Sequence, residues 1–311
     1  PANYSNIFCP IRGVQSNWAS ILHEHSSVYS CLGGARFRES ICRPCFATLG
    51  FKCIISAALT RCVFFRNPFL LYKRLNKFKM LPDIWRNAYL LAPSKAVALA
   101  LEKTGFQQNK IKIINNYVDV PNDYTEPSGN TILFVGRLVK EKGLQDVIDI
   151  IAGLPANLRI CGTGSYENIL REKVLALKIQ NQVTFLGNVD RSTIEKEYRA
   201  ARFVVFPTRI FEAFGNVGLE AFAQGRPVIA YDSGGNRDWL INEENGFLIA
   251  SGNKRMLKKK VFELLRDEKK VTNMGRAGHK SCKDLFNYNR YKDQLLSLYT
   301  DATNKKCNIY G

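Results

Sequence analysis

Two glutamates in one short segment are the residues of this sequence with the clearest capacity for chemistry. Glu212 and Glu220 stand eight positions apart in segment 211–221, FEAFGNVGLEA, shortly after an apolar run. Paired carboxylates can serve as the acid and the nucleophile of a glycosidase, which must lie about 5 to 9.5 Å apart. On one continuous helix, eight positions give about 12 Å of rise and roughly 80° of rotation, which is too far for such a pair. The spacing therefore argues against a glycosidase.

A different arrangement of the same segment fits a phosphorylated ligand. We expect Glu212 to lie in the loop after a strand at 203–206, and Glu220 to lie inside a helix that begins near Gly215. The backbone N–H groups that open this helix belong to Gly215, Asn216 and Val217. Free N–H groups and the helix dipole together bind anions such as a diphosphate. The two carboxylates would then hold hydroxyl groups on either side of the anion, such as those of a sugar and a ribose.

Basic residues and glycines follow two other apolar runs. Arg137 and Lys142 come after a predicted strand at 132–135, where their charges could reach a phosphate or form a solvated basic loop. Gly162 and Gly164 follow the next predicted strand and allow the close approach of a ligand or of another backbone. These residues are candidates for the same anion site as the glutamate segment.

A regular alternation of strands and helices, beginning at Thr131, must position these residues. The predicted strands are 132–135, 158–161, 183–186, 203–206 and 227–231. The predicted helices between them are 144–152, 166–177, 194–200 and 217–223. This order implies right-handed β-α-β crossovers and a parallel, doubly wound α/β sheet. Ligands of such Rossmann-like sheets bind at the carboxyl ends of the strands, where the candidate residues lie.

A shorter α/β region precedes this one. It contains predicted strands at 87–92 and 112–114 with a helix at 95–104 between them, and segment 121–130 is the predicted linker. After residue 247 the sequence predicts helices and no further strong strand. The predicted domains are a partial amino-terminal Rossmann-like domain (1–125), a carboxyl-terminal Rossmann-like domain (126–287) and a terminal helix (288–311) that could return to the first domain.

The positive net charge of the chain predicts an anionic partner. The 311 residues carry a net charge of +18, which suits nucleic acid, an anionic membrane surface or phosphorylated small molecules. Segment 43–80 holds eight Lys or Arg residues and no Asp or Glu, interleaved with aromatic and aliphatic residues. A helix at 68–81 could lie on a membrane interface or could pack on its own domain with a solvated basic face. No nucleic-acid recognition module is apparent, so nucleic acid is not an expected partner.

The remaining composition predicts compartment and metal content. No window of eighteen apolar residues and no signal peptide is apparent, which predicts a cytoplasmic chain, peripheral on the cytosolic membrane face if segment 43–80 binds lipid. Nine cysteines are too few for a disulfide scaffold. The spacing of Cys42 and Cys45 is compatible with zinc or with plain thiols, and the other cysteines of this cluster are Cys31, Cys53 and Cys62. The sequence contains no Asp-x-Asp motif.

The motifs occur in an order that resembles the carboxyl-terminal domain of family-4 retaining glycosyltransferases of GT-B fold. They are Gly136-Arg137 with Lys142-Gly143, Gly162-x-Gly164, Phe185-x-Gly187-x-Val189, Glu212-x-Phe214-Gly215 with Glu220-Ala221, Gly225-x-Pro227-Val228 and Gly234-Gly235. Ala92-Pro93-Ser94 resembles the end of that family's amino-terminal domain, and His23 resembles a histidine of that domain that faces the donor sugar. The segment that follows His23 resembles members that build bacterial surface polysaccharides.

The resemblance implies a role for each matching position. Arg137 and Lys142 would neutralise the diphosphate of a nucleotide sugar, with N–H groups from Phe214, Gly215, Asn216 and Val217. Glu220 would hold the ribose, Glu212 the transferred sugar, and Val189 would lie against the nucleobase. His23 would touch the sugar from the other domain. The implied activity is retaining, metal-independent hexosyl transfer to a glycan or lipid-linked acceptor, with no cofactor.

Two departures from the family's pattern leave alternatives open. The chain begins at Pro1 and has only about 22 residues before His23, so the resemblance implies two Rossmann-like domains of which the amino-terminal one is truncated. Asp238 stands where the family often has Glu. The alternatives are a nucleotide-sugar-binding protein without transferase activity, a nucleic-acid-binding protein and an isomerase of the nucleotide sugar. The sequence specifies neither the nucleobase and sugar of the donor nor the acceptor.

Overall fold

A computed structural model describes residues 21–23, 37–38, 43–44, 89–103 and 106–307 of the chain, the side chains of 21–23, 37–38, 43–44 and 302–307 excepted. The five clustered cysteines and almost all of the basic segment 43–80 lie outside the described residues. The chain divides into two compact units, one formed by residues 1–115 and 292–311 and the other by residues 116–291. The domain boundaries expected after residues 125 and 287 stay predictions.

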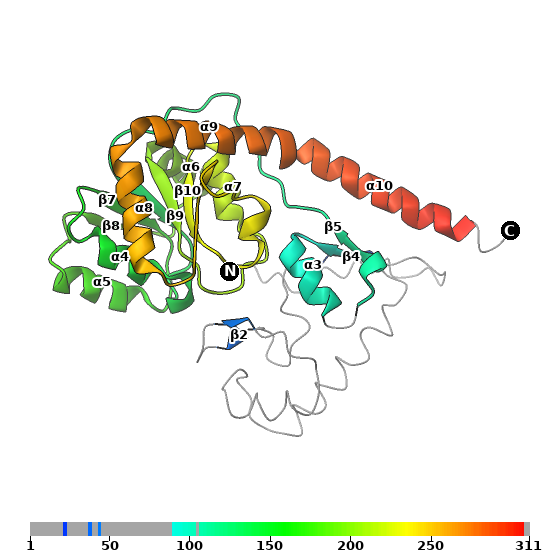
Figure 1. Ribbon diagram of the computed structural model, residues 1–311, viewed down its shortest axis with the longest axis horizontal. Helices are drawn as coiled ribbons and strands as arrows, with labels where there is room; N and C mark the ends of the chain where they lie inside the picture. The colour runs from blue at the N-terminus through cyan, green and yellow to red at the C-terminus, as the bar shows by residue number, and fades with distance from the viewer. Residues whose placement is uncertain (1–20, 24–36, 39–42, 45–88, 104–105, 308–311) are drawn as a thin grey trace, which may run out of the picture. The chain divides into compact units, whose positions relative to one another are not determined.

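The second unit is built around a parallel sheet, as the sequence predicts (Figure 1). The sheet has six strands, against five in the prediction. Its strand order is β11-β10-β9-β6-β7-β8, and every neighbouring pair is parallel. The strands are β6 (Thr131–Val135), β7 (Asn157–Cys161), β8 (Val183–Gly187), β9 (Phe203–Phe206), β10 (Val228–Tyr231) and β11 (Gly246–Ile249). The runs FVVF of β9 and VIAY of β10 are fully buried, as expected for central parallel strands.

Helices cover both faces of this sheet. They are α4 (Leu144–Ile151), α5 (Glu167–Ala176), α6 (Arg191–Ala200), α7 (Asn216–Ala223), α8 (Lys254–Arg266) and α9 (Glu268–Leu285). Ile132 and Phe134 of β6 belong to the hydrophobic core that includes α4, α5 and α8. Leu133, between them, belongs to the core that includes α6 and α7. This alternation follows from the two-residue period of a strand and gives the three-layered, doubly wound arrangement of the prediction.

The last strand of the sheet is a correction to the sequence-based prediction, which has no further strong strand after residue 247. β11 is a short edge strand, Gly246–Ile249, and pairs in parallel with β10. A β-carbon at Gly246 would lie 2.1 Å from the carbonyl oxygen of Val228, so only glycine allows this pairing. The periodicity of four residues that begin with glycine is too short to indicate a strand.

The first unit contains a small parallel sheet of order β1-β4-β5. Its strands are β1 (Ile21–His23), β4 (Tyr89–Ala92) and β5 (Ile111–Ile113). Helix α3 (Lys95–Glu102) begins at an N-cap formed by Ser94, whose hydroxyl accepts a hydrogen bond from the Val97 N–H at 3.2 Å. These elements agree with the predicted β-α-β pattern.

The remaining elements are short or terminal. They are the antiparallel strands β2 (Phe37–Arg38) and β3 (Arg43–Pro44), the 3₁₀ turns η2 (Gln108–Lys110), η3 (Lys140–Lys142) and η4 (Gly234–Asp238), and helix α10 (Tyr288–Cys307). Within the part of the chain that the structure describes, no helix is both long enough and apolar enough to cross a bilayer.

Candidate functional site

The strand order of the large sheet reverses between β6 and β9. From β6 the chain proceeds outward to β7 and β8, and it then returns to place β9 on the other side of β6. Loops that leave the carboxyl ends of such neighbouring strands diverge, and doubly wound sheets bind ligands at this point. The loop after β6 contains Arg137 and Lys142, and the loop after β9 contains Glu212. The topology therefore brings together residues that are far apart in the sequence.

Lys142 and Glu212 are in direct contact. The Nζ atom of Lys142 donates a hydrogen bond to Oε2 of Glu212 at 2.7 Å, and both side chains are mostly buried, with 16% and 22% exposed. The ammonium also lies 5.4 Å from the ring centroid of Phe206, at the end of β9. A partly desolvated cation and a carboxylate at the switch of strand order can bind a phosphate and a hydroxyl group, respectively.

Backbone contacts fix the two loops against each other. The Arg209 N–H donates to the carbonyl of Glu141 at 2.8 Å, joining the loop after β9 to turn η3. Gly143 has φ of +74°, and a β-carbon there would lie 2.0 Å from the carbonyl oxygen of Pro207. Any other residue would push the loops apart, so this glycine is required for the contact between Lys142 and Glu212.

Turn η4 holds the backbone of Glu212 from the other side. The N–H of Gly235 donates to the Glu212 carbonyl at 2.8 Å. Gly234 has φ of +55°, and a β-carbon there would lie 2.1 Å from the same carbonyl oxygen. Gly234 and Gly235 therefore hold Glu212 in place by contacting its backbone carbonyl.

The amino end of α7 lies directly after this loop. Gly215, in the left-handed region with φ of +93°, turns the chain into the helix. Among the described residues, none of the N–H groups from Phe214 to Val217 donates a hydrogen bond. The Asn216 side-chain oxygen accepts a hydrogen bond from the Asn116 amide at 2.8 Å. Four open donors and the positive end of a helix dipole are available to an anion at this point. That they bind a diphosphate stays a prediction.

Glu220 lies inside α7, more than one turn from its start, as predicted. Its surroundings differ from those of Glu212. Its Oε2 accepts a hydrogen bond from the hydroxyl of Tyr198, a buried residue of α6, at 2.8 Å. Burial raises the pKa of Glu220, while the Tyr198 hydroxyl and the charge of Arg191 oppose this shift. In the described part of the chain, no hydrogen bond joins Glu220 to Lys142 or Glu212.

The two glycines after β7 support the loop that carries Arg137. A β-carbon at Gly162 would lie 2.0 Å from the Gly136 carbonyl, and one at Gly164 would lie 2.3 Å from the Leu138 carbonyl. The Leu138 N–H also donates to Thr163 at 2.9 Å. Of the two uses the sequence leaves open for these glycines, the structure shows the close approach of another backbone.

The structure describes the side chains of three further predicted site residues, Arg137, Val189 and Phe214, but not that of His23. Arg137 is exposed, and its guanidinium has no hydrogen-bond or ion-pair partner among the described residues. Val189 follows β8 and packs, partly buried, against the hydrophobic core that includes α6 and α7. The Phe214 side chain is buried in the same core, so only its backbone can serve a ligand. His23 ends strand β1, and its side chain lies outside what is described.

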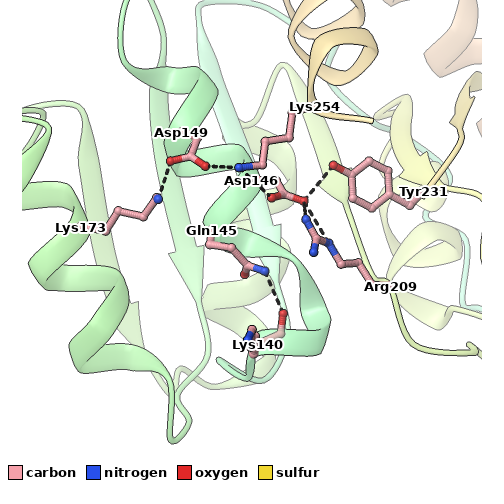
Figure 2. A network of polar contacts seen from close by, with 8 residues as sticks. All are labelled: Lys140, Gln145, Asp146, Asp149, Lys173, Arg209, Tyr231 and Lys254. Carbon is pink, nitrogen blue, oxygen red and sulfur yellow. Dashed lines mark hydrogen bonds and ion pairs between the residues drawn. The ribbon is translucent and has the colours of Figure 1, made fainter. Parts of the chain in front are cut away.

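A buried charged network beside the site has no counterpart in the sequence-based prediction (Figure 2). Asp146 of α4, with 1% of its side chain exposed, pairs with Arg209 and accepts a hydrogen bond from the Tyr231 hydroxyl at 2.9 Å. The signal in the sequence is an aspartate among the apolar positions of a helix, LQDVIDII. Because helical periodicity alone does not distinguish a buried aspartate from an exposed one, its partners are evident only in the fold.

Within the described ranges, no three or more His, Cys, Asp and Glu side chains are grouped so that they could hold a metal ion. Cationic side chains and backbone N–H groups are present at the strand ends, and Lys142 and the start of α7 are the best defined of them.

The fold places the chain among the doubly wound α/β proteins, with a helix amino end beside the switch of strand order. Residues 122–281, just over half of the chain, match the family of glycosyl transferases group 1. The chain belongs to this family. The matched range contains every predicted site residue except His23.

Curated relatives agree with this assignment. The capsular polysaccharide biosynthesis glycosyltransferase CapM of Staphylococcus aureus is 29% identical over 63% of this chain and 52% of CapM. An uncharacterised glycosyltransferase of Methanocaldococcus jannaschii is 36% identical over 44% of this chain and 36% of its own length. The chain thus spans between about a third and a half of the length of these two relatives.

Solved structures show the same fold. HepE of Anabaena, in complex with UDP, superposes with a TM-score of 0.66 at 23% identity over 74% of this chain and 67% of HepE. Sucrose-phosphate synthase of Thermosynechococcus elongatus superposes with a TM-score of 0.72 at 21% identity over 94% of this chain and 69% of the synthase. The fold is therefore that of GT-B glycosyltransferases.

Proposed function

We propose that this chain is a retaining glycosyltransferase of the family-4 type that moves a sugar from a nucleotide-diphosphate donor to a glycan or lipid-linked acceptor. The observation that carries the proposal is the contact between Lys142 and Glu212 beside the open N–H groups of α7. A cation, a carboxylate and a helix amino end at one point match the phosphate and the hydroxyl groups of a sugar diphosphate.

The proposed donor lies along the carboxyl ends of β6 and β9. Arg137, Lys142 and the N–H groups of α7 bind the diphosphate, and Glu212 exchanges its bond to Lys142 for hydroxyl groups of the sugar. Glu220 accepts hydrogen bonds from the ribose, for which its Tyr198 contact fixes one carboxylate oxygen. Val189 lies against the nucleobase. His23 contributes to the sugar site in this proposal on the strength of the family resemblance.

The proposed reaction breaks the bond between the anomeric carbon of the sugar and the diphosphate oxygen. The acceptor hydroxyl forms a new bond to the same face of that carbon, and its proton passes to the departing phosphate. Charge develops on the diphosphate as the bond lengthens, so preorganised cations and N–H donors lower the barrier. We propose that Arg137, Lys142 and α7 supply this stabilisation without a metal or a cofactor.

The names of relatives support the donor and acceptor classes. HepE has been crystallised with UDP-glucose, and a mutant of TarM, a further structural neighbour, with fondaparinux, alpha-GlcNAc-glycerol and UDP. CapM acts in capsular polysaccharide biosynthesis, and LpsE of Rhizobium meliloti in that of the lipopolysaccharide core. We propose that the acceptor is a membrane-linked glycan precursor at the cytosolic face of the membrane. This proposal is compatible with the biosynthetic roles of CapM and LpsE. The contact of segment 43–80 with anionic lipid is part of this proposal.

A transfer assay with the whole chain tests the proposal. Purified protein is incubated with UDP-, GDP- and ADP-sugars and with bacterial lipid-linked glycan precursors, and proton NMR of the product reports the anomeric configuration. We expect transfer with retained configuration, unchanged in EDTA and reduced at least tenfold in Glu212→Gln. An inverted product would disprove the retaining mechanism, and loss of activity in EDTA would disprove metal independence.

The same assay separates the alternative functions. Saturable binding of a nucleotide sugar without transfer or hydrolysis would favour a nucleotide-sugar-binding protein. Conversion of the donor without an acceptor would indicate an isomerase. Binding to RNA or DNA that weakens steeply with salt would instead favour a nucleic-acid-binding protein.

A further inference from the structure

We propose that Asp146 and Arg209 are positioning residues that set the separation of the loops carrying Lys142 and Glu212. This inference rests on the proposed function, because it assigns a task to two residues beside the proposed donor site. Neither residue is expected to contact the donor. Their task is to keep the cation and the carboxylate of the site at a fixed spacing.

The contact between the two residues is direct (Figure 2), with 1% of the Asp146 side chain and 25% of the Arg209 side chain exposed. Oδ2 of Asp146 accepts hydrogen bonds from Nε of Arg209 at 3.1 Å and from Nη2 at 2.5 Å. The Tyr231 hydroxyl at the end of β10 donates to the same oxygen at 2.9 Å. Burial, followed by the charge of Asp146, raises the pKa of Tyr231, so its hydroxyl keeps the proton it donates. Three donors on one buried oxygen hold the carboxylate in a single orientation.

A second cation faces the other carboxylate oxygen. Lys254 of α8 lies 3.5 Å from Oδ1 of Asp146 and 2.5 Å from Oδ2 of Asp149, and Lys173 of α5 also pairs with Asp149. The buried side chain of Asp146 thus lies between two cations, Arg209 and Lys254. Removing one partner of a buried ion pair is costly, so the pair of Asp146 and Arg209 resists separation.

The position of this pair in the chain connects it to the site. Asp146 follows Lys142 by four residues, and Arg209 precedes Glu212 by three. The two contacts, Asp146 with Arg209 and Lys142 with Glu212, therefore close a ring that consists of two short chain segments. The backbone hydrogen bond from Arg209 to Glu141 lies within this ring. If the contact between Lys142 and Glu212 breaks, the contact between Asp146 and Arg209 still limits how far the loops can separate.

This arrangement has a consequence for donor binding. In the proposed function, the donor replaces the bond between Lys142 and Glu212 with a phosphate and a sugar hydroxyl. The backbone hydrogen bond from Arg209 to Glu141 would then be left with the pair of Asp146 and Arg209 to limit the spread of the loops. Small misplacements of reacting groups are expensive in rate. The contact between Asp146 and Arg209 persists while the donor is bound, so the cation and carboxylate keep the spacing that the transition state requires.

Amide hydrogen exchange tests the proposal independently of any donor. Exchange in peptides covering 136–143 and 207–215 is measured for the wild type, Asp146→Asn and Arg209→Lys. Arg209→Lys keeps the charge, and with it the fold, but cannot donate two hydrogen bonds to one oxygen. Asp149→Asn is the matched control, because Asp149 lies on the same helix and shares Lys254, but has no contact with 207–215 among the described residues. We expect faster exchange, by fivefold or more, in both loop peptides of the two test variants and not in the control.

Kinetics provide the second readout. With the donor that the wild type uses in the transfer assay, kcat of both test variants should fall about tenfold to a hundredfold. The dissociation constant of UDP, or of the matching nucleoside diphosphate, should stay within threefold, because Lys142 and α7 remain. Asp149→Asn should match the wild type. A merely structural role would instead lower the melting temperature and the active fraction without this split.

Each outcome is decisive. Unchanged exchange in both loop peptides would overturn the proposal whatever the kinetics show. Faster exchange with kinetics like those of Asp149→Asn would overturn the positioning role. Faster exchange in a protein whose wild type transfers no sugar would support the contact between the loops but overturn its catalytic role together with the proposed function.

Discussion

The ammonium of Lys142 and the carboxylate of Glu212 lie 2.7 Å apart, although 70 positions separate them in the chain. They come from the loops after two strands that are neighbours only because the strand order reverses between β6 and β9. Each residue belongs to a different motif in the sequence, and the contact makes them one site. In the proposed function, the donor separates the pair and gives each member a new partner.

Lys142→Met should lower kcat/KM for the nucleotide-sugar donor by about a hundredfold to a thousandfold, which is the range for one preorganised electrostatic group. The substitution removes the cation that faces the diphosphate and leaves Glu212 without its partner. Steady-state transfer kinetics measure this effect.

Lys260→Met is a closely matched control for this prediction. Lys260 also pairs with carboxylates, lies over an aromatic ring and has 17% of its side chain exposed, against 16% for Lys142. It belongs to α8, away from the strand-end loops. The kcat/KM of Lys260→Met for the nucleotide-sugar donor should stay within threefold of the wild-type value. Equal losses in the two variants would show that the effect of Lys142 is not specific to the site.

Gly234→Ala should reduce transfer at least tenfold by displacing Glu212. The new β-carbon would overlap the Glu212 carbonyl, and the left-handed φ of +55° adds backbone strain. Gly153→Ala separates these two causes, because Gly153 has φ of +87° and no atom within 4 Å of the added carbon. Both variants should be destabilised in thermal unfolding, but only Gly234→Ala should lose transfer. Similar transfer rates in the two would contradict the role of Gly234 in holding Glu212.

Glu220→Gln should weaken donor binding and stabilise the fold at neutral pH. Burial raises the pKa of Glu220 above its ordinary value of 4.5, so the fold favours the protonated form. Ionisation therefore costs stability as the pH rises through the interval between 4.5 and the raised pKa. The amide avoids this cost and can still accept the hydrogen bond from Tyr198.

Two measurements check the Glu220 prediction. The melting temperature of Glu220→Gln should exceed that of the wild type at pH 7.5, and the two should converge at pH 4. Affinity for a nucleotide sugar should fall about tenfold to a hundredfold, as expected for hydrogen bonds to a charged acceptor. A variant that is less stable at pH 7.5 would show that the carboxylate is stabilising in the fold, contrary to its raised pKa.

Gly218→Ala should destabilise the protein despite the better helix propensity of alanine. The gain of about 1 kcal/mol in a helix interior is opposed by an overpacking cost of about 1–3 kcal/mol. The added carbon would lie 2.1 Å from the buried Trp239 ring. Denaturant unfolding should show that Trp239→Phe, which makes room, reduces the cost of Gly218→Ala. Strictly additive free energies would rule out the Trp239 contact as the cause.

The sequence predicted the large sheet well because its central strands are continuous apolar runs that alternate with amphipathic helices. β9 and β10 lie within a residue of their expected positions. β11 was missed, because four residues that begin with glycine carry no recognisable period. The start of α7 at Asn216 followed from Gly215, whose left-handed conformation ends the loop.

The sequence by itself determined the fold class, the family resemblance and the candidate residues, because these depend on local pattern and on motif order. Only the tertiary structure decided which of them meet. In the structure, Lys142 contacts Glu212, and Glu220 accepts a hydrogen bond from Tyr198. Gly162 and Gly164 support the loop that carries Arg137. It also reveals the buried pair of Asp146 and Arg209. Partners 63 or 70 positions apart are set by the order of strands in the sheet, which no local pattern of side chains encodes.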